Sequence, residues 1–444
     1  MKNKLPSYIA DAKAVPKNER APWYKNIAPA YAGIILWFVF WQDIVNTGTG
    51  GGGLAYGTML PLASLAVAAV LSYLLFYAAP ALFGMKTGYG LAVLGSSIFG
   101  TKGGVFMPGL LMGLLQFGWL SVNIYFASIL IRETLTFVPL WAIIVSEGIL
   151  ATFVGLKGIK YVAGISTYLP IIPLAVLAIL LFNTAGTIDS FNPQILSLSS
   201  SVNNPPLGEF GVFAFVTTYV LGFFATAGAA GADFGSNARN ARDVNLGGLV
   251  GITLAMAAMG GAAIFILAGA YGNPATAQIL AGEGNPLNVT KIMGAVLGEN
   301  TGKICMFLLA LSAFPSACFA SLIAANAFKT MLPKVDSNLS VSLGGAAAII
   351  LALTGVAGNA ADVFSFIGAS FGPICGAFLA EYILSKGEWK LASVNFNSVG
   401  WVSWLCGFAV GVLPNFGVPL PISPLAAFVA GFALYACLRK KPRR

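Results

Sequence analysis

The chain has 444 residues, of which 57% are hydrophobic and only 9% are charged. Soluble domains average about 25% charged residues, so this composition excludes a water-facing surface over most of the chain. Histidine is absent, which excludes histidine-dependent hydrolytic triads and proton relays and removes the commonest metal ligand.

The first 26 residues are polar and basic rather than apolar, so we expect no cleavable signal peptide and a cytosolic N-terminal tail over 1–26. Beyond this tail, apolar runs recur that reach the ~20 residues a helix needs to cross a bilayer. The pattern predicts an all-α membrane protein. We place about twelve transmembrane helices by hydropathy, centred near residues 37, 68, 117, 148, 172, 220, 257, 316, 347, 373, 406 and 430.

Basic residues fall in alternate connections between these predicted helices, which explains the net charge of +9 without nucleic acid. On one side they are Lys2, Lys4, Lys13, Lys17, Arg20, Lys25, Lys86, Lys102, Lys157, Lys160, Arg239, Arg242, Lys329, Lys334, Lys386, Lys390 and the tail 439–444. The exceptions on the other side are Arg132, Lys291 and Lys303. By the positive-inside rule, we expect an even number of spans in the cytoplasmic membrane, with both termini cytosolic.

No soluble domain is expected. The longest polar stretches, 189–209 and 272–303, are predicted to be external loops without room for a core of their own. Five cysteines stand singly inside apolar segments, which indicates small core residues rather than disulfides or a metal site. They are Cys305, Cys318, Cys375, Cys406 and Cys437.

Two apolar segments contain signals for a broken helix. The first span runs through Gln42 and Asp43 into the glycines 50–53, and the sixth runs through the small residues of 222–233. Unwound backbone inside a bilayer is tolerated only where it lines a cavity or a ligand. Breaks at matching positions of two inverted repeats indicate a substrate site near the midplane. The alternative is that these small residues only permit close helix packing.

Three carboxylates lie in or next to predicted spans. Asp43 is the most informative, because a carboxylate in mid-span costs roughly 3 kcal/mol and is usually functional. It could be a cation ligand, a proton carrier or an acceptor for a substrate N–H, or it could be solvated at the outer end of a shortened helix. Glu147 offers the same choices with less support, and Asp233 is expected at the cytosolic end of span six, close to Arg239 and Arg242.

The third span carries an aromatic ring flanked by amides on one helical face, because Gln116, Trp119 and Asn123 are spaced i, i+3 and i+7. Such a set suits a flat heteroaromatic solute, which stacks on the ring while the amides bind its edge. Phe223 and Phe224 could form the opposite wall. The alternative is that these side chains only pack and bond neighbouring helices.

Six motifs in order along the chain resemble the bacterial cytosine permeases of the nucleobase:cation symporter-1 family, also known as the purine-cytosine permease family. They are FGMKTG at 83–88, SIFGTKGG at 97–104, QFGW at 116–119, GADFGSNARNAR at 231–242, AEYIL at 380–384 and SVNF at 393–396. The resemblance implies a LeuT-like fold with alternating access. Two five-helix inverted repeats would occupy 27–183 and 210–385 of a transporter domain spanning 27–438, and two peripheral helices would occupy 397–438.

The resemblance also implies roles for individual residues. Trp119 is similar to the stacking tryptophan of the family, Asn123 to a polar edge-binding residue, and Phe224 to the aromatic on the other side of the base. Backbone from Phe40 to Ile44 would contribute carbonyls to a cation site. The predicted substrate-binding set is Gln42, Asp43, Trp119, Asn123, Phe223, Phe224, Ser312 and Ser316, and the possible cation site is Phe40, Asp43 and Ser316.

Span eight departs from the family pattern, which often has a run of threonine, serine and asparagine there. Here 312–319 reads SAFPSACF, so only Ser316 keeps a hydroxyl where a sodium ligand is expected, and Ala317 stands near the expected asparagine. The coupling ion, Na⁺ or H⁺, therefore stays open, and Asp43 could have taken over charge compensation.

The sequence predicts a symporter that imports a nucleobase-like heterocycle, cytosine or a purine. The alternative is the same fold with another cargo: hydantoin, allantoin, a vitamin precursor such as hydroxymethylpyrimidine, or an amino acid. Isolated carboxylates without histidine argue against an enzyme, and the absence of a selectivity repeat argues against a channel. We expect a monomer in the lipid bilayer, with no cofactor beyond the coupling ion.

Overall fold

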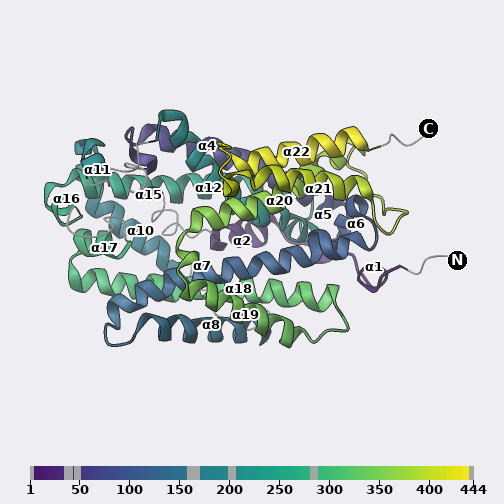
Figure 1. The fold of residues 1–444 in the computed structure, drawn as a ribbon, viewed down its shortest axis with the longest axis horizontal. Coiled ribbons are helices and arrows are strands. Elements are labelled where there is room, and N and C mark those ends of the chain that lie inside the picture. Colours follow the sequence, from purple (N-terminus) through teal and green to yellow (C-terminus); the bar gives the residue numbers. More distant parts are fainter. Residues whose placement is uncertain are drawn as a thin grey trace.

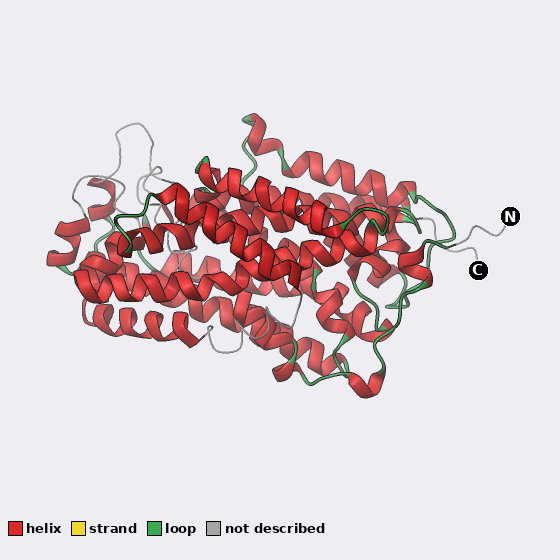
Figure 2. Ribbon diagram, turned by 90° about the horizontal axis from the view of Figure 1, so that it is seen from below, coloured by secondary structure: helices red, strands yellow, loops and turns green. Residues whose placement is uncertain are grey.

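The computed structural model describes residues 5–34, 44, 52–157, 171–198, 207–280 and 289–439. Regular structure in these ranges is helical, apart from one isolated bridge between Ala21 and Ala238 (Figure 2). The α-helices are α1 (Ser7–Ala10), α2 (Ile27–Ile34), α4 (Met59–Leu71), α5 (Ala78–Thr87), α6 (Leu91–Phe99), α7 (Leu111–Thr134), α8 (Leu140–Lys157), α10 (Ile171–Thr184), α11 (Gln194–Leu198), α12 (Glu209–Ala229), α13 (Gly231–Ser236), α14 (Ala241–Gly248), α15 (Ala255–Gly272), α16 (Pro274–Leu280), α17 (Val289–Leu297), α18 (Glu299–Met331), α19 (Ser337–Leu353), α20 (Ala360–Leu384), α21 (Ser398–Gly411) and α22 (Ser423–Leu438). Turns of π-helix at Ser72–Tyr77, Val105–Leu110 and Leu249–Leu254 extend neighbouring α-helices, and 3-10 turns occupy Lys17–Glu19, Trp23–Lys25, Gly52–Leu54, Ala185–Ser190, Val356–Gly358 and Leu413–Phe416.

Within the described ranges, eight continuous helices are long and apolar enough to cross a membrane. They are Met59–Thr87, Val105–Thr134, Leu140–Lys157, Ile171–Ser190, Glu209–Ala229, Ala241–Gly272, Glu299–Met331 and Ala360–Leu384. Three shorter apolar helices follow at Ser337–Leu353, Ser398–Gly411 and Ser423–Leu438. Each predicted centre from residue 68 onward falls in its own helix of this set, and the centre near 37 lies outside the described residues.

The outer faces of these helices carry large apolar side chains. Phe182 on α10 is 87% exposed and Leu343 on α19 is 64% exposed. A soluble monomer rarely exposes contiguous apolar surface of this kind, so lipid is the expected contact.

The long helices form two sides of one bundle (Figure 1). Helices α7, α8, α18 and α19 all pack on one another along the lower side of the view, and we call them the four-helix group. Helices α4, α12, α15 and α20 lie on the other side, with α21 and α22 packed on α20. The described part of the chain, 5–439, begins and ends at one end of the bundle, and α11, α16 and α17 lie at the other.

Helices α7 and α18 run antiparallel in close contact, and small residues make this possible. A Cβ atom on Gly113 would lie 3.0 Å from Cβ of Ala327, so the two helices approach closely there. At the other end of the pair, Oγ1 of Thr134 donates a hydrogen bond to the carbonyl oxygen of Lys303 at 3.1 Å. This register places the middle of α18, including Ser316, at the level of Asn123 on α7.

Helix α12 corrects one prediction. It is helical from Glu209 to Ala229 and is interrupted only at Ala230, before α13 begins. A Cβ atom on Gly222 would lie 2.3 Å from the carbonyl oxygen of Phe364, and one on Gly228 would lie 2.6 Å from Cβ of Phe76. The break predicted within 222–233 is therefore confined to Ala230, and the small residues before it serve close packing instead. The break predicted in the first span lies outside the described residues.

The polar stretches that we predicted to be plain loops contain short helices. Helix α11 lies within 189–209, and α16 and α17 lie within 272–303. The reason is local burial: Leu280 on α16 and Ile292 and Met293 on α17 are fully buried against neighbouring helices. A hydropathy window of about 20 residues is too wide to detect helices of this length.

The N-terminal tail from residue 5 onward packs across the end of the bundle that holds both termini. Its hydrogen bonds run from Tyr8 Oη to Thr101 O (2.7 Å), Val15 N to Gly88 O (3.0 Å), Ala21 N to Asn237 O (2.8 Å) and Trp23 N to Asp243 Oδ1 (3.2 Å). Asp233 lies at this end, where its Oδ1 accepts a hydrogen bond from the backbone N–H of Leu91 at 3.1 Å. Arg239 forms its ion pair with Asp243, at 2.8 Å, rather than with Asp233.

Candidate functional site

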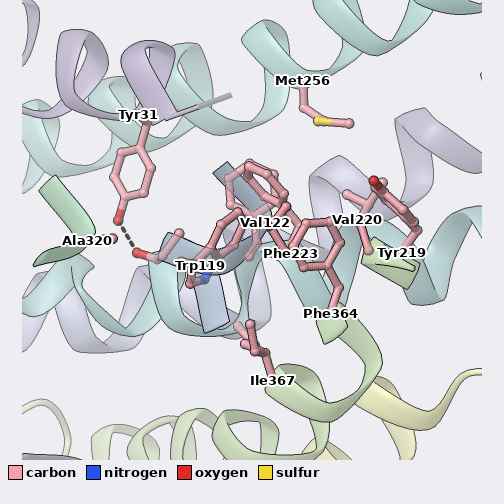
Figure 3. Packing of buried hydrophobic residues seen from close by; sticks show 14 of the residues in the cluster. Tyr31, Trp119, Val122, Tyr219, Val220, Phe223, Met256, Ala320, Phe364 and Ile367 are labelled. Atoms are coloured by element: carbon pink, nitrogen blue, oxygen red, sulfur yellow. Dashed lines mark hydrogen bonds between the residues drawn. The ribbon is translucent and has the colours of Figure 1, made fainter. Parts of the chain in front are cut away.

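Four aromatic side chains meet where α7 of the four-helix group faces α12 and α20 (Figure 3). We call them the aromatic cluster: Trp119 on α7, Tyr219 and Phe223 on α12, and Phe364 on α20. The indole centroid of Trp119 lies 4.8 Å from that of Phe223, at 89°, and 4.8 Å from that of Phe364, at 34°. Phe364 also meets Phe223 at 5.5 Å and Tyr219 at 5.0 Å, both edge to face. The cluster therefore joins the two sides of the bundle.

The indole of Trp119 is held in one orientation. Its Nε1–H donates a hydrogen bond to Oγ1 of Thr226 on α12 at 3.0 Å. A buried indole N–H normally requires such a partner. Because Trp119 is only 6% exposed and is bonded at one edge, its ring faces are directed toward Phe364 and the interior of the bundle.

One turn further along α7, Asn123 carries an unsatisfied acceptor. Its Nδ2 donates to the backbone carbonyl of Trp119 at 2.8 Å, which fixes the amide orientation, since a carbonyl can only accept. Its Oδ1 is buried and has no hydrogen-bond partner among the residues described. Buried acceptors are nearly always paired, and leaving one unpaired costs about 1–3 kcal/mol. This oxygen is therefore suited to an N–H donor on a bound solute.

The other described residues of the predicted site are arranged less distinctively. Ser312 donates its hydroxyl to Leu309 O on its own helix at 2.7 Å. Ser316 is half-buried on α18, which stays helical through Pro315. Gln116 is buried, and its Nε2 lies 3.5 Å from Sδ of Met112. The binding roles of the two serines remain predictions.

Phe223 and Phe224 were expected to face Trp119 across a bound solute. In the structure, the edge of one ring meets the face of the other in a direct contact between Phe223 and Trp119. Phe224 is fully buried, and the centroid of its ring lies 5.0 Å from that of Phe223. Its contact with substrate stays a prediction. Sequence reasoning missed Phe364, because no spacing relative to the other predicted site residues distinguishes it among the chain's 32 phenylalanines.

The predicted cation site is represented by Ser316 alone, because Phe40 and Asp43, like Gln42, lie outside the described residues. In the part of the chain that the structure covers, no group of three or more Cys, Asp or Glu side chains gathers as a metal site would require.

Comparison with known proteins adds independent information. No protein-family model matches the chain. Cytosine permease of Escherichia coli strain K12 is 26% identical over 365 residues, which cover 80% of this chain and 78% of the relative. The cytosine permease of Escherichia coli O157:H7 matches to the same extent.

Three solved structures share the fold. The inward-facing conformation of Mhp1 superposes with a TM-score of 0.68 at 14% identity, over 96% of this chain and 94% of that one. Mhp1 in a closed conformation, described as a nucleobase-cation-symport-1 family transporter with bromovinylhydantoin bound, gives 0.64 at 17% identity, over the same shares of both chains. A Na⁺-coupled sialic acid symporter in its substrate-bound, outward-open state gives 0.60 at 11% identity, over 98% of this chain and 92% of that one.

The helical bundle, its superposition on these transporters and the match to curated permeases over most of its length agree with the six sequence motifs. The fold is the LeuT-like transporter fold, and over most of its length the chain is similar to cytosine permeases, in line with its resemblance to the nucleobase:cation symporter-1 family.

Proposed function

We propose that this protein is a secondary active transporter that imports a nucleobase-like heterocycle, cytosine or a purine, together with a cation, Na⁺ or H⁺. The observation that carries the proposal is the 26% identity to proteins named cytosine permease over 80% of the chain. The aromatic cluster and the buried Oδ1 of Asn123 support it, because together they offer a flat apolar surface and an acceptor for a ring N–H.

Binding of a flat solute at Trp119 requires a rearrangement. A ring held between two aromatic faces needs about 7 Å between them, because each contact takes about 3.5–4.0 Å. The centroids of Trp119 and Phe364 are only 4.8 Å apart. A solute held between these two rings would therefore separate α7 from α20, and this would couple binding to movement of the two sides of the bundle.

The remaining parts of the proposal rest on the sequence and the family. Phe40, Asp43 and Ser316 would form the cation site, and Gln42 and Ser312 would complete the substrate site. The protein would be a monomer in the cytoplasmic membrane with both termini cytosolic. The alternative cargo is a different small solute in the same fold, and the bromovinylhydantoin bound to Mhp1 makes a hydantoin the first to test.

Ligand-dependent thermal stability of the purified protein tests the substrate class. A solute present at about 100 times its Kd stabilises the folded state by roughly 2.7 kcal/mol, so binding raises the melting temperature. We expect such a rise with cytosine or a purine in a panel that also contains a hydantoin, allantoin, hydroxymethylpyrimidine and amino acids. A rise with an amino acid alone would contradict the nucleobase assignment while leaving the transporter fold intact.

Asn123→Leu in the same panel tests the acceptor. Removing one partner of a buried hydrogen bond costs about 1–3 kcal/mol, so the Kd of the stabilising solute should rise between about fivefold and 150-fold. The variant's own melting temperature should not fall, because the unpaired oxygen is removed with it. Asn183→Leu is the matched control, since Asn183 makes the same bond to a carbonyl four residues back but is exposed on α10. Equal Kd values for wild type and Asn123→Leu would exclude Asn123 from recognition.

A further inference from the structure

A second buried carboxylate lies inside the four-helix group, away from the aromatic cluster. Glu147 is seven residues from the start of α8 and ten from its end, and only 7% of its surface is exposed. Helices α7, α18 and α19 all pack against α8. The side chain is therefore near the middle of a membrane-spanning helix and is enclosed by protein rather than by lipid.

The contacts of Glu147 are almost entirely uncharged. Its Oε2 accepts a hydrogen bond from Oγ of the fully buried Ser128 on α7, at 3.2 Å. Beside it, a Cβ atom on Gly148 would lie 2.3 Å from Ile349 on α19 and 3.2 Å from Ile124 on α7, so the adjacent surface is tightly packed and apolar.

The charged groups of the surrounding helices lie at their ends. Lys157 is ten residues further along α8, roughly 15 Å away at 1.5 Å per residue. On α7 the charged residues are Arg132 and Glu133, both in the last turn. On α18, Glu299 and Lys303 lie near the start of the helix and form an ion pair at 2.7 Å, and Lys329 lies in the last turn. Helix α19 contains no titratable residue. In the described structure no Lys or Arg forms an ion pair with Glu147.

The uncharged surroundings of Glu147 favour a proton over a metal cation as the ligand of its carboxylate. An ionised carboxylate buried without a counter-charge is strongly disfavoured, so the group must be neutralised. Hard metal cations are bound by several oxygen ligands, whereas among the described residues Glu147 hydrogen-bonds to one serine hydroxyl only. A proton neutralises the carboxylate without any further ligand.

We propose that a coupling proton binds at Glu147, apart from the cation site proposed at Phe40, Asp43 and Ser316. The inference rests on the proposed function for its role in symport, but the binding site stands on the geometry of α7, α8 and α18. One proton joins the carboxylate to give the neutral acid, and the same proton is released when the site becomes hydrated.

The location of this site explains how protonation could affect substrate binding. Ser128 follows Asn123 by five residues on α7, and α18, which packs against α8, carries Ser316. The helices that enclose Glu147 are thus the helices that carry the proposed substrate contacts. The neutral acid favours the tightly packed interface, and the carboxylate favours an interface open to water, so proton binding biases the position of α7 and α18.

Infrared difference spectroscopy of the purified protein across pH tests the binding site without any substrate. We expect the carbonyl stretch of a protonated carboxyl group near neutral pH, lost on titration to higher pH and absent in Glu147→Gln. Glu209→Gln, the same change at an exposed residue at the start of α12, should leave the signal intact. If wild type and Glu147→Gln gave identical spectra throughout, Glu147 would not be the proton site.

Transport of radiolabelled cytosine into proteoliposomes tests the coupling. Glu147→Gln should retain exchange of internal for external cytosine but lose accumulation driven by an inward proton gradient, along with cytosine-induced alkalinisation outside the vesicles. Glu147→Asp, which keeps a carboxyl group, should restore part of both. Proton-driven accumulation undiminished in Glu147→Gln would overturn the proposal. Failure of wild type to transport cytosine would instead count against the proposed substrate, and the infrared result would still decide the site.

Discussion

Trp119→Ala should abolish saturable uptake of the heterocycle and strongly weaken its binding. Stacking of a base on an aromatic side chain contributes about 1–3 kcal/mol, which corresponds to a Kd between about fivefold and 150-fold higher. The truncation also removes the hydrogen bond to Thr226 and the contact with Phe364, which position the two sides of the bundle. The loss should therefore lie at or beyond the upper end of this range. Equilibrium binding of radiolabelled cytosine to purified protein measures it.

Two further variants separate stacking from a general loss of packing. Trp119→Phe keeps an aromatic face but loses the indole N–H, so it should bind more tightly than Trp119→Ala and less tightly than wild type. Trp404→Ala truncates another largely buried tryptophan, stacked on Phe408 and bonded to Ser370 O at 2.9 Å, and should leave the Kd unchanged. A folded Trp119→Ala variant with the wild-type Kd would remove the aromatic cluster from substrate recognition.

Gly222→Ala should lower the thermal stability of the protein markedly. The added methyl group would lie 2.3 Å from the backbone carbonyl oxygen of Phe364, which cannot move as a flexible side chain could. Overpacking of this kind costs about 1–3 kcal/mol and sometimes more. Because Phe364 also contacts Trp119, the displaced α20 should weaken heterocycle binding as well. Melting temperature in detergent, followed by intrinsic fluorescence, gives the first result, and ligand binding gives the second.

Gly261→Ala is the matched control for Gly222→Ala. At Gly261 on α15 the new Cβ would have ordinary contact, 3.5 Å from Leu62, and alanine is the better helix former by about 0.8–1.0 kcal/mol. Its melting temperature should stay the same or rise. If Gly222→Ala were as stable as Gly261→Ala but inactive, the glycine would serve flexibility in α12 rather than packing.

The membrane spans were predictable because each is encoded by about 20 consecutive residues, and the bilayer fixes that length. The structure accordingly places a helix at every predicted centre it describes, including those near residues 68 and 430. Small residues are harder to interpret, since the same glycine can permit either unwinding or close packing. At Gly222 only the position of Phe364, 142 residues away in the chain, decides between them.

The helical period of the sequence predicted part of the candidate site. The helical spacing of Trp119 and Asn123 placed both on one face of a helix, whereas the direct contact between Trp119 and Phe223 was not predicted, because we expected the solute to lie between them. Phe364 could not be found, because its role arises from the packing of α20 on α12. Nor could the sequence show that Oδ1 of Asn123 is left unpaired, which depends on where Nδ2 finds its acceptor.

Uptake into proteoliposomes under separately imposed Na⁺ and H⁺ gradients tests cation-coupled transport of a heterocycle most directly. We predict that radiolabelled cytosine or a purine accumulates above its equilibrium level when an inward cation gradient is imposed, and only equilibrates when both gradients are absent. Folded, correctly inserted protein that accumulates neither solute under either gradient would contradict the proposed function.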